Sequence, residues 1–228
     1  MKKKAVIIGA IAVLALVAIV FLWPGEIKTR GFSQDHDPWE EPRVVKSVIT
    51  RSECDEIIRE VNSKFARSEL VGVPGGTDNT RTSETAWVSK KHPVARKILR
   101  RACELTGKSF ENCEDLQVVR YKPGTYYRRH HDSCCEDTQA CRDFEGRGGQ
   151  RVGTLLVYLN DDFTDGETHF PNHKGGHKMK ADPGSAIFFR PLGSDSAQCH
   201  PRALHEGLPI TAGTKYVCNA WVREGNFK

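Results

Sequence analysis

The hydrophobic positions divide the chain into an apolar N-terminal run, two segments with helical period and a C-terminal half of short strands. A polar start at 52–55 precedes apolar residues at helical spacing between Ile57 and Phe65, which predicts an amphipathic helix. A second helix is predicted to begin near Pro93 and to end at Gly107, because proline favours a first turn and glycine a C-terminal cap.

The period after residue 107 is that of strands separated by turns. Clusters of turn-forming residues at 160–166, 171–176 and 191–196 interrupt the apolar runs. Helices followed by many short strands, with no alternation between the two, predict a mainly β (α+β) fold. The favoured architecture is a double-stranded β-helix, or jelly roll, buttressed by helices on one sheet. The predicted strands are Leu116–Tyr121, Gly153–Leu159, Ala186–Arg190 and Tyr216–Val222.

The N-terminal run has the length of a membrane-spanning helix. Residues 5–23 carry no charge and as a helix would span about 30 Å, the thickness of a hydrocarbon core. Trp23 lies where an interfacial aromatic residue belongs, and Pro24 ends the helix. A cleaved signal peptide is the alternative, but its apolar region is usually shorter, and no small-x-small cleavage site follows. We therefore expect a transmembrane signal anchor.

The rest of the chain divides into a linker and one domain. Residues 24–41 are polar and show no period, which predicts a tether after the cytoplasmic tip at 1–4 and the anchor at 5–23. Residues 42–228 have the length of one ordinary domain. The lysines of the tip favour a cytoplasmic N-terminus. We expect a single-pass membrane protein whose domain is extracytoplasmic, in the lumen of the endoplasmic reticulum or secretory pathway.

Composition indicates a compartment and argues against one class of partner. Eight cysteines fit an oxidising lumen as disulfides, whose pairing the sequence leaves open. A zinc cluster around Cys134, Cys135 and Cys141 is the alternative, although no paired CxxC motif supports it. The net charge of +5 comes largely from the lysines at 2–4, so the domain has no basic excess that would indicate nucleic acid.

A histidine–carboxylate pair carries the candidate chemistry. His130 and Asp132 lie two apart, so on an extended segment both side chains point to one face while His131 points to the other. Two histidines and one carboxylate can occupy one face of Fe(II) and leave its other positions open. His205 is the favoured third ligand, because Lys215, ten residues later, offers a cation for the carboxylate of an organic co-substrate. The other candidates are His169, His173, His177 and His200.

Motifs around these residues occur in a recognisable order. They are Tyr121–Asp132, Arg151–Asn160, Gly166–Pro171, and Leu204–Pro209 continuing to Gly213–Trp221. With them, residues 42–228 resemble the prolyl 4-hydroxylase family of Fe(II)/2-oxoglutarate-dependent dioxygenases, in its small membrane-anchored algal and algal-virus form. The resemblance implies Fe²⁺, 2-oxoglutarate and O2 as cofactor and co-substrates, with ascorbate as a further cofactor.

The resemblance also implies roles by position. His130, Asp132 and His205 match the iron ligands, and Lys215 matches the residue that pairs with the distal carboxylate of 2-oxoglutarate. These four residues form the implied catalytic set. The implied co-substrate pocket is lined by Tyr121 and Tyr158, with Thr168 as a third polar contact. Positions near the peptide groove are matched by Tyr127, Arg151 and Trp221, for which core packing is the alternative.

The implied activity is peptidyl-proline 4-hydroxylation of proline-rich or collagen-like peptides, with release of succinate and CO2. One alternative keeps the iron chemistry and changes the target to lysine or another residue. The other is a catalytically silent lumenal binding module, against which the complete set of four residues argues. An insert at 133–149 separates this chain from compact family members. We expect a disulfide-fastened surface loop there, with a lid over the site as the alternative.

Overall fold

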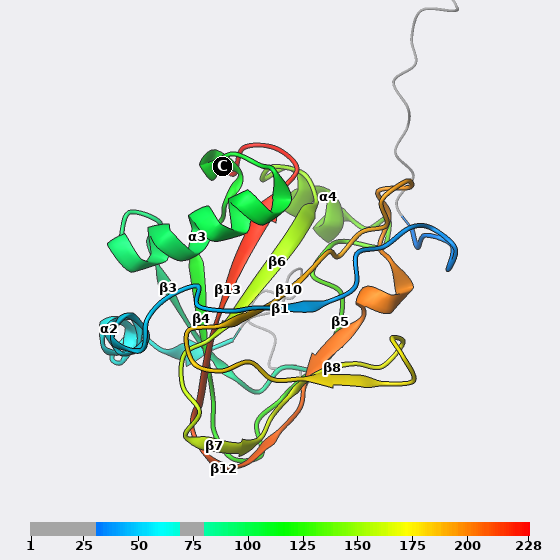
Figure 1. Ribbon diagram of the computed structural model, residues 1–228. Coiled ribbons are helices and arrows are strands. Elements are labelled where there is room, and N and C mark those ends of the chain that lie inside the picture. The colour runs from blue at the N-terminus through cyan, green and yellow to red at the C-terminus, as the bar shows by residue number, and fades with distance from the viewer. Residues whose placement is uncertain (1–30, 69–79) are drawn as a thin grey trace, which may run out of the picture.

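A seven-stranded antiparallel sheet dominates the fold in the computed structural model, which describes residues 31–68 and 80–228 (Figure 1). Its strands in spatial order are β1 (Arg43–Val45), β10 (Ala186–Phe189), β6 (Arg151–Tyr158), β13 (Lys215–Arg223), β4 (Leu116–Tyr121), β3 (Glu84–Val88) and β2 (Ala66–Arg67). A four-stranded antiparallel sheet consists of β5 (Tyr127–His130), β11 (His205–Gly207), β8 (Thr168–Phe170) and β9 (His177–Met179). A two-stranded ribbon pairs β12 (Ile210–Gly213) with β7 (Phe163–Asp165).

The mainly β prediction is confirmed, and the packing of the two larger sheets is consistent with a jelly roll. All four predicted strands are present: β4 has the predicted bounds, β6 and β13 begin earlier, and β10 ends one residue sooner. The strands that sequence patterning missed are short. They include β5 and β11, which have four and three residues, because such lengths give no measurable alternation.

Helices cover one face of the large sheet. Helix α2 (Arg51–Val61) begins with a capping box between Thr50 and Glu53, so the cap is Thr50 and the helix starts slightly before the predicted position. Helix α3 (Pro93–Thr106) has Pro93 in its first turn and Gly107 at its C-cap with φ +70°, as predicted. The remaining helical segments are α4 (Gln139–Glu145), η1 (Phe110–Asn112) and η2 (Pro201–Ala203).

The large sheet separates two hydrophobic clusters. Along β13, Cys218, Ala220 and Val222 belong to the cluster under α2 and α3, whereas Val217 belongs to the cluster between the sheets. This alternation is the two-residue period of a strand that is buried on both faces. Lys215 and Trp221 share the parity of Val217, so β13 presents both toward the space between the sheets.

Residues 31–41, predicted as part of a tether, pack against the domain instead. Asp37 is buried and accepts hydrogen bonds from the backbone of Asp195 and Ser196. The Trp39 ring stacks on His200 with centroids 4.9 Å apart. The polar residues of this segment show no helical or strand period. The residues that bind Asp37 lie about 160 positions away in the sequence, so a local pattern could not reveal them.

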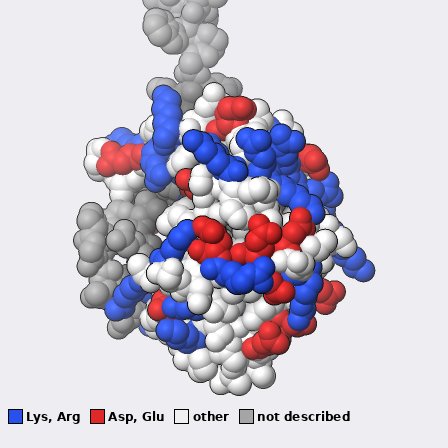
Figure 2. All heavy atoms as spheres, turned by 90° about the vertical axis from the view of Figure 1, so that its left-hand side faces the viewer, with Lys and Arg blue, Asp and Glu red and all other residues white. Residues whose placement is uncertain are grey.

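The predicted anchor at 5–23 lies outside the described residues and stays a prediction. Across 31–68 and 80–228, every helix is too short or too polar to cross a bilayer. Figure 2 shows the face that carries α2 and α3, where basic and acidic side chains are intermixed. Pairs such as Lys97–Glu53 and Arg101–Glu104 account for part of this pattern.

Candidate metal and co-substrate site

Three predicted ligands converge at one end of the small sheet. His130 ends β5, His205 begins β11, and the two are register partners. Asp132 follows in the turn after β5, and its Oδ1 lies 3.5 Å from Nε2 of His130 and 3.8 Å from Nε2 of His205. All three ligand atoms lie within 4.8 Å of one another. The three side chains are called the trio below.

Backbone carbonyls determine which nitrogen of each imidazole faces the trio. Nδ1 of His130 lies 2.8 Å from the carbonyl oxygen of Arg128, and Nδ1 of His205 lies 3.0 Å from that of Ala203. A ring nitrogen facing a carbonyl carries the proton in the neutral imidazole, so each Nε2 keeps its lone pair. Both histidines are thereby oriented to donate to a shared cation.

Two donors from the large sheet orient the carboxylate. Thr154 on β6 donates its hydroxyl proton to Oδ2 of Asp132 at 2.6 Å, and the indole N–H of Trp221 on β13 donates to the same oxygen at 3.1 Å. Because both bonds go to Oδ2, the other oxygen, Oδ1, is left facing the two imidazoles. The carboxylate is thus presented through one oxygen.

Protonation states in the trio suit a divalent cation. Burial, with a contribution from His130, lowers the pKa of His205 to about 4. Burial also acts to raise the pKa of Asp132, but the facing His205 and His130 outweigh it and hold that pKa well below its usual range. Two imidazoles and one carboxylate on one side of a cation form the donor set that fits Fe(II) and leaves other positions open.

Thr154→Val is expected to weaken divalent-cation binding roughly 10- to 100-fold, because partners that orient metal ligands have effects of that size. Valine keeps the branched shape and removes only the donor to Asp132. Titration with Co(II), followed by its absorption spectrum, measures the affinity. The control is Thr211→Val, at an exposed threonine that is hydrogen-bonded to Asp165. An unchanged affinity in Thr154→Val would show that the hydroxyl does not orient the carboxylate.

Lys215 is a buried cation in the same interior. Its side chain is 2% exposed, and Nζ donates to the carbonyl oxygen of Gly166 at 2.7 Å. Within the described part of the chain, no carboxylate lies within ion-pair distance of it. Burial, with Lys180 nearby, lowers the pKa of Lys215 to about 7. A buried ammonium without a carboxylate partner is costly, and an anionic co-substrate would relieve that cost.

Aromatic and hydroxyl groups surround this lysine. Nζ lies 5.1 Å from the ring centre of Tyr121 and 5.0 Å from that of Tyr158. The Tyr158 hydroxyl is 3.0 Å from the hydroxyl of Thr168, and the ring centre of Phe163 lies 6.0 Å from Nζ of Lys215. The structure therefore brings the three residues predicted to line the co-substrate pocket to Lys215.

An apolar wall lies beside the trio. The ring centroids of Phe189 and Phe170 lie 4.7 Å and 5.7 Å from that of His205. Both phenylalanines belong to the cluster between the sheets that also contains Tyr121 and Tyr158. The trio and Lys215 therefore border one interior, with polar groups at a few defined points and apolar surface between them, which is typical of small-molecule sites.

The three residues predicted near the peptide groove lie close to the trio. Tyr127 stacks on the His130 ring with centroids 3.6 Å apart. Arg151 is buried, forms two hydrogen bonds to Glu114 at 2.7 Å and 2.9 Å, and lies 3.4 Å from the ring centre of Trp221. Trp221 is itself buried and oriented toward the carboxylate of the trio. All three side chains make packing contacts, and their role near a peptide groove stays a prediction.

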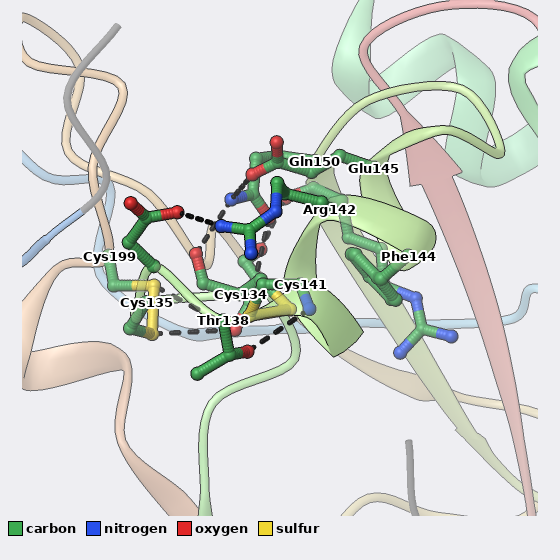
Figure 3. Close-up of a disulfide and its surroundings, with 12 residues drawn as sticks. Cys134, Cys135, Thr138, Cys141, Arg142, Phe144, Glu145, Gln150 and Cys199 are labelled. Carbon is green, nitrogen blue, oxygen red and sulfur yellow. Dashed lines mark hydrogen bonds and ion pairs between the residues drawn. A yellow bond between two sulfur atoms is a disulfide. The ribbon is translucent and has the colours of Figure 1, made fainter. Parts of the chain in front are cut away.

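The insert at 133–149 folds as a short helix fastened by two disulfides (Figure 3). Cys134 pairs with Cys141 inside the insert, and Cys135 pairs with Cys199 in the connection between β10 and β11. Their sulfurs are therefore not available to the alternative zinc cluster. The remaining four cysteines are buried and unpaired by disulfides: Cys54, Cys103, Cys113 and Cys218.

Sequence reasoning missed Thr154 and Trp87. Thr154 is a lone polar residue within the apolar run of β6, which is a signal that could have been used. Trp87 on β3 is 50% exposed and lies 6.4 Å from Trp221, ring centre to ring centre. No local pattern in the sequence relates these two rings, because only the fold brings them together.

The other candidate histidines lie apart from the trio. His169 bonds through Nδ1 to Glu206 at 2.8 Å, and His173 and His200 pack around the Trp39 ring. His131 lies against Phe32 on the side of the Cys135 and Cys199 sulfurs, as its position between the two ligands predicts.

Comparisons with known proteins agree with this geometry. A family model described as the 2OG-Fe(II) oxygenase superfamily matches residues 116–223. A putative prolyl 4-hydroxylase of Acanthamoeba polyphaga mimivirus is 44% identical over 86% of this chain and 80% of its own length. Prolyl 4-hydroxylase 1 of Arabidopsis thaliana is 31% identical over 80% of this chain and 69% of its own.

Solved structures show the same fold. A viral collagen prolyl hydroxylase from Paramecium Bursaria Chlorella virus-1, in a complex with 2OG, has 31% sequence identity and a TM-score of 0.62. The match covers 80% of this chain and 96% of that chain. A Trichoplax adhaerens prolyl hydroxylase in complex with a hypoxia inducible factor peptide fragment shares the fold at 19% identity, with a TM-score of 0.56 over 80% and 83% of the two chains.

Proposed function

Because the chain belongs to the prolyl 4-hydroxylases of the 2OG-Fe(II) oxygenase superfamily, we propose that it hydroxylates proline in proline-rich or collagen-like peptides. It is a 2-oxoglutarate-dependent dioxygenase that uses Fe²⁺, 2-oxoglutarate and O2. The trio of His130, Asp132 and His205 would hold the iron, and Lys215 the far carboxylate of 2-oxoglutarate. The observation that supports this proposal most is that the trio and the Lys215 ammonium border one interior. Among the described residues, no carboxylate lies within ion-pair distance of that ammonium.

Each residue has a defined task in this proposal. Bound Fe²⁺ supplies the redox chemistry that couples proline hydroxylation to conversion of 2-oxoglutarate and O2 into succinate and CO2. His130 and His205 donate through Nε2, and Thr154 and Trp221 keep Asp132 presenting one oxygen. These bonds orient the donor atoms of the trio toward one another.

The co-substrate pocket positions one end of a diacid and excludes water. Lys215 provides a compact cation with three donors, of which the Gly166 carbonyl takes one. The hydroxyl groups of Tyr158 and Thr168 bond to each other, which holds both near the ammonium. Phe170 and Phe189 are buried beside His205, so charges next to them interact through a medium of low polarity.

The peptide contact is proposed at the aromatic surface next to the trio. Tyr127 is half-buried over His130, and Trp87 exposes half of its surface beside Trp221. Proline-rich segments adopt an extended polyproline II helix that docks on aromatic surfaces at small entropic cost. Tyr127 and Trp87 would then hold such a segment across the open side of the trio.

The experiment is succinate production with a proline-rich peptide, against a control peptide in which every proline is alanine. Peptide-dependent succinate, together with addition of one oxygen atom to a proline residue by mass spectrometry, supports the proposal. Succinate produced equally with the proline-free peptide would assign the same iron chemistry to another residue. No turnover with Fe²⁺ supplied would favour a silent binding module.

The affinity for 2-oxoglutarate is expected to fall as the pH rises above about 7. Burial lowers the pKa of Lys215 to about 7 in the protein without ligand. A bound carboxylate favours the ammonium, so this pKa is higher in the complex, and binding takes up a proton above pH 7. The loss approaches about tenfold per pH unit until the higher pKa is passed. Calorimetric titration of 2-oxoglutarate from about pH 6 to about pH 9 measures it.

Lys215→Arg is the matched control for the pH effect, because a guanidinium stays charged throughout this range. Its 2-oxoglutarate affinity should be weaker and nearly independent of pH. An equally steep profile in the arginine variant would assign the pH dependence to a different group.

Placement of the domain outside the cytoplasm remains our proposal. The disulfides Cys134–Cys141 and Cys135–Cys199 support it, since such bonds persist in oxidising compartments. The anchor predicted at 5–23 would tether the enzyme to the membrane through which its peptide substrates are secreted.

A further inference from the structure

The Cys135–Cys199 disulfide joins the two chain segments that carry the trio. Cys135 lies three residues after Asp132, and Cys199 lies six residues before His205. Their Cα atoms are 5.5 Å apart, and the bond connects the insert to the β10–β11 connection (Figure 3). It therefore links regions that are separated by 64 residues in sequence.

Strand pairing holds only one side of the trio. β5 ends at His130 and β11 begins at His205, so this register pair stands at the end of the ladder. Asp132 lies beyond it in a turn, and the chain before His205 is the single 3-10 turn η2. The disulfide crosses between the same two segments on the far side, so ladder and disulfide enclose the trio from opposite ends.

Cys199 is a fixed anchor for this cross-link. It forms isolated β-bridges with Phe32 and with Leu192, and its carbonyl oxygen accepts from the backbone N–H of Ser33 at 2.9 Å. The half-cystine is 1% exposed. The turn that is bonded to Cys199 through Cys135 is therefore held in place relative to the surrounding backbone.

The other half-cystine follows a segment that is fastened less directly. The hydroxyl of Ser133 donates to the carbonyl oxygen of Arg151 at 2.7 Å, and the Gln150 side chain bonds to both backbone groups of Cys134. These bonds tie the turn to β6 and the base of the insert. Among the described residues, the covalent tie from this turn to the His205 segment is Cys135–Cys199.

The orientation of the His205 imidazole depends on η2. Nδ1 of His205 bonds to the carbonyl of Ala203, which lies in η2 between Cys199 and His205. Any movement of η2 rotates the acceptor that fixes the imidazole. The position of Cys199 thus bears on which direction Nε2 of His205 faces.

We propose that the Cys135–Cys199 disulfide is a positioning element of the metal site, which holds η2 against the Asp132 turn so that the trio keeps its geometry before the metal binds. The proposal rests on the trio being the metal site of the proposed function. Breaking the disulfide would release η2 and the turn from each other, so the trio would have to be reassembled at the expense of metal affinity.

The second disulfide provides a matched control. Cys134–Cys141 lies next to Cys135–Cys199 but closes a separation of only 7 residues, and both of its half-cystines belong to the insert. A double variant Cys134→Ser/Cys141→Ser thus removes the same chemical bond in the same neighbourhood without separating the two ligand-bearing segments.

The experiment compares Co(II) affinity and the Co(II) absorption spectrum in the wild-type protein, Cys135→Ser/Cys199→Ser and the control variant. We expect affinity roughly 10- to 100-fold weaker and an altered spectrum in Cys135→Ser/Cys199→Ser, the range for groups that orient metal ligands. The control variant should stay within about twofold of wild type. Thermal unfolding of all three metal-free proteins reports general destabilisation separately.

Wild-type affinity and spectrum in Cys135→Ser/Cys199→Ser would overturn the proposal, as would equal losses in both double variants. If that variant does not fold, the control variant Cys134→Ser/Cys141→Ser, which keeps Cys135–Cys199, is reduced mildly, its thiols are blocked with methyl methanethiosulfonate, and Co(II) is titrated while circular dichroism verifies the fold. Retained affinity then overturns the proposal, and weakened affinity with an intact fold supports it. His205→Ala with wild-type Co(II) affinity would instead refute the metal site itself.

Discussion

Asp132→Ala is expected to abolish peptide-dependent succinate production while the protein still folds. Asp132 is the anionic member of the trio, and its Oδ1 faces both imidazoles. Removing this carboxylate should lower succinate production by more than the roughly 10- to 100-fold effect of removing a partner that merely orients a ligand. The measurement is succinate formed at saturating 2-oxoglutarate and peptide, with Fe²⁺ affinity determined separately under anaerobic conditions.

The fold should survive because the loss is limited to one buried charge and its two side-chain hydrogen bonds. Thr154 and Trp221 each lose an acceptor, at a cost of about 1–3 kcal/mol per unsatisfied buried group. Asp161→Ala is the control, since that carboxylate is exposed and pairs with Arg51 away from the trio. Full succinate production by Asp132→Ala would mean that the trio is wrongly assigned.

Lys215→Ala is expected to raise the KM for 2-oxoglutarate about 10²- to 4 × 10³-fold and to leave the peptide KM nearly unchanged. Removing one partner of a buried ion pair costs about 3–5 kcal/mol, and each 1.4 kcal/mol is a factor of ten. The ammonium lies among Tyr121, Tyr158 and Phe163, where water cannot replace it readily as a partner for the carboxylate. Initial rates over a range of 2-oxoglutarate concentrations measure the effect.

Lys180→Ala separates a specific contact from general electrostatics. Lys180 is an exposed lysine close enough to influence Lys215, and its ammonium lies 4.0 Å from the ring centre of Phe163. Its removal changes the local charge by the same amount while Lys215 and the three rings around it stay in place. We expect less than a threefold change in this control, in keeping with the small contribution of exposed charges. A 2-oxoglutarate requirement in Lys215→Ala equal to that of wild type would refute the assigned role.

The sequence predicted those parts of the site that depend on local spacing. His130 and Asp132 lie two apart on an extended segment, and the structure does place both on the side of His205 while His131 faces away. Lys215 was predicted through its distance from His205 along the chain, and β13 carries it into the interior. Long strands and capped helices were predicted for the same reason, because their patterns extend over enough residues.

Features that depend on contacts between distant segments could not be predicted. The two bonds to Oδ2 of Asp132 come from β6 and β13, and no spacing in the sequence relates Thr154 or Trp221 to that carboxylate. The pairing of Cys135 with Cys199 was open for the same reason. Residues 31–41 were predicted as a tether because their polarity is typical of linkers, whereas Asp37 is buried by loop backbone that donates to it.

The two-residue alternation along β13 has a consequence for the length of the co-substrate. Lys215 and Trp221 share one face of this strand, while residues of the other parity enter the cluster under the helices. A strand advances about 3.3 Å per residue, so a cation can be relocated on the co-substrate side only in steps of about 7 Å. The strand therefore offers positions for a cation only at widely spaced intervals. For a dicarboxylate one methylene longer, no neighbouring position on this face of β13 places a cation at the right distance. On this strand, acceptance of a longer acid would come from a different side chain at position 215, not from a cation at another position.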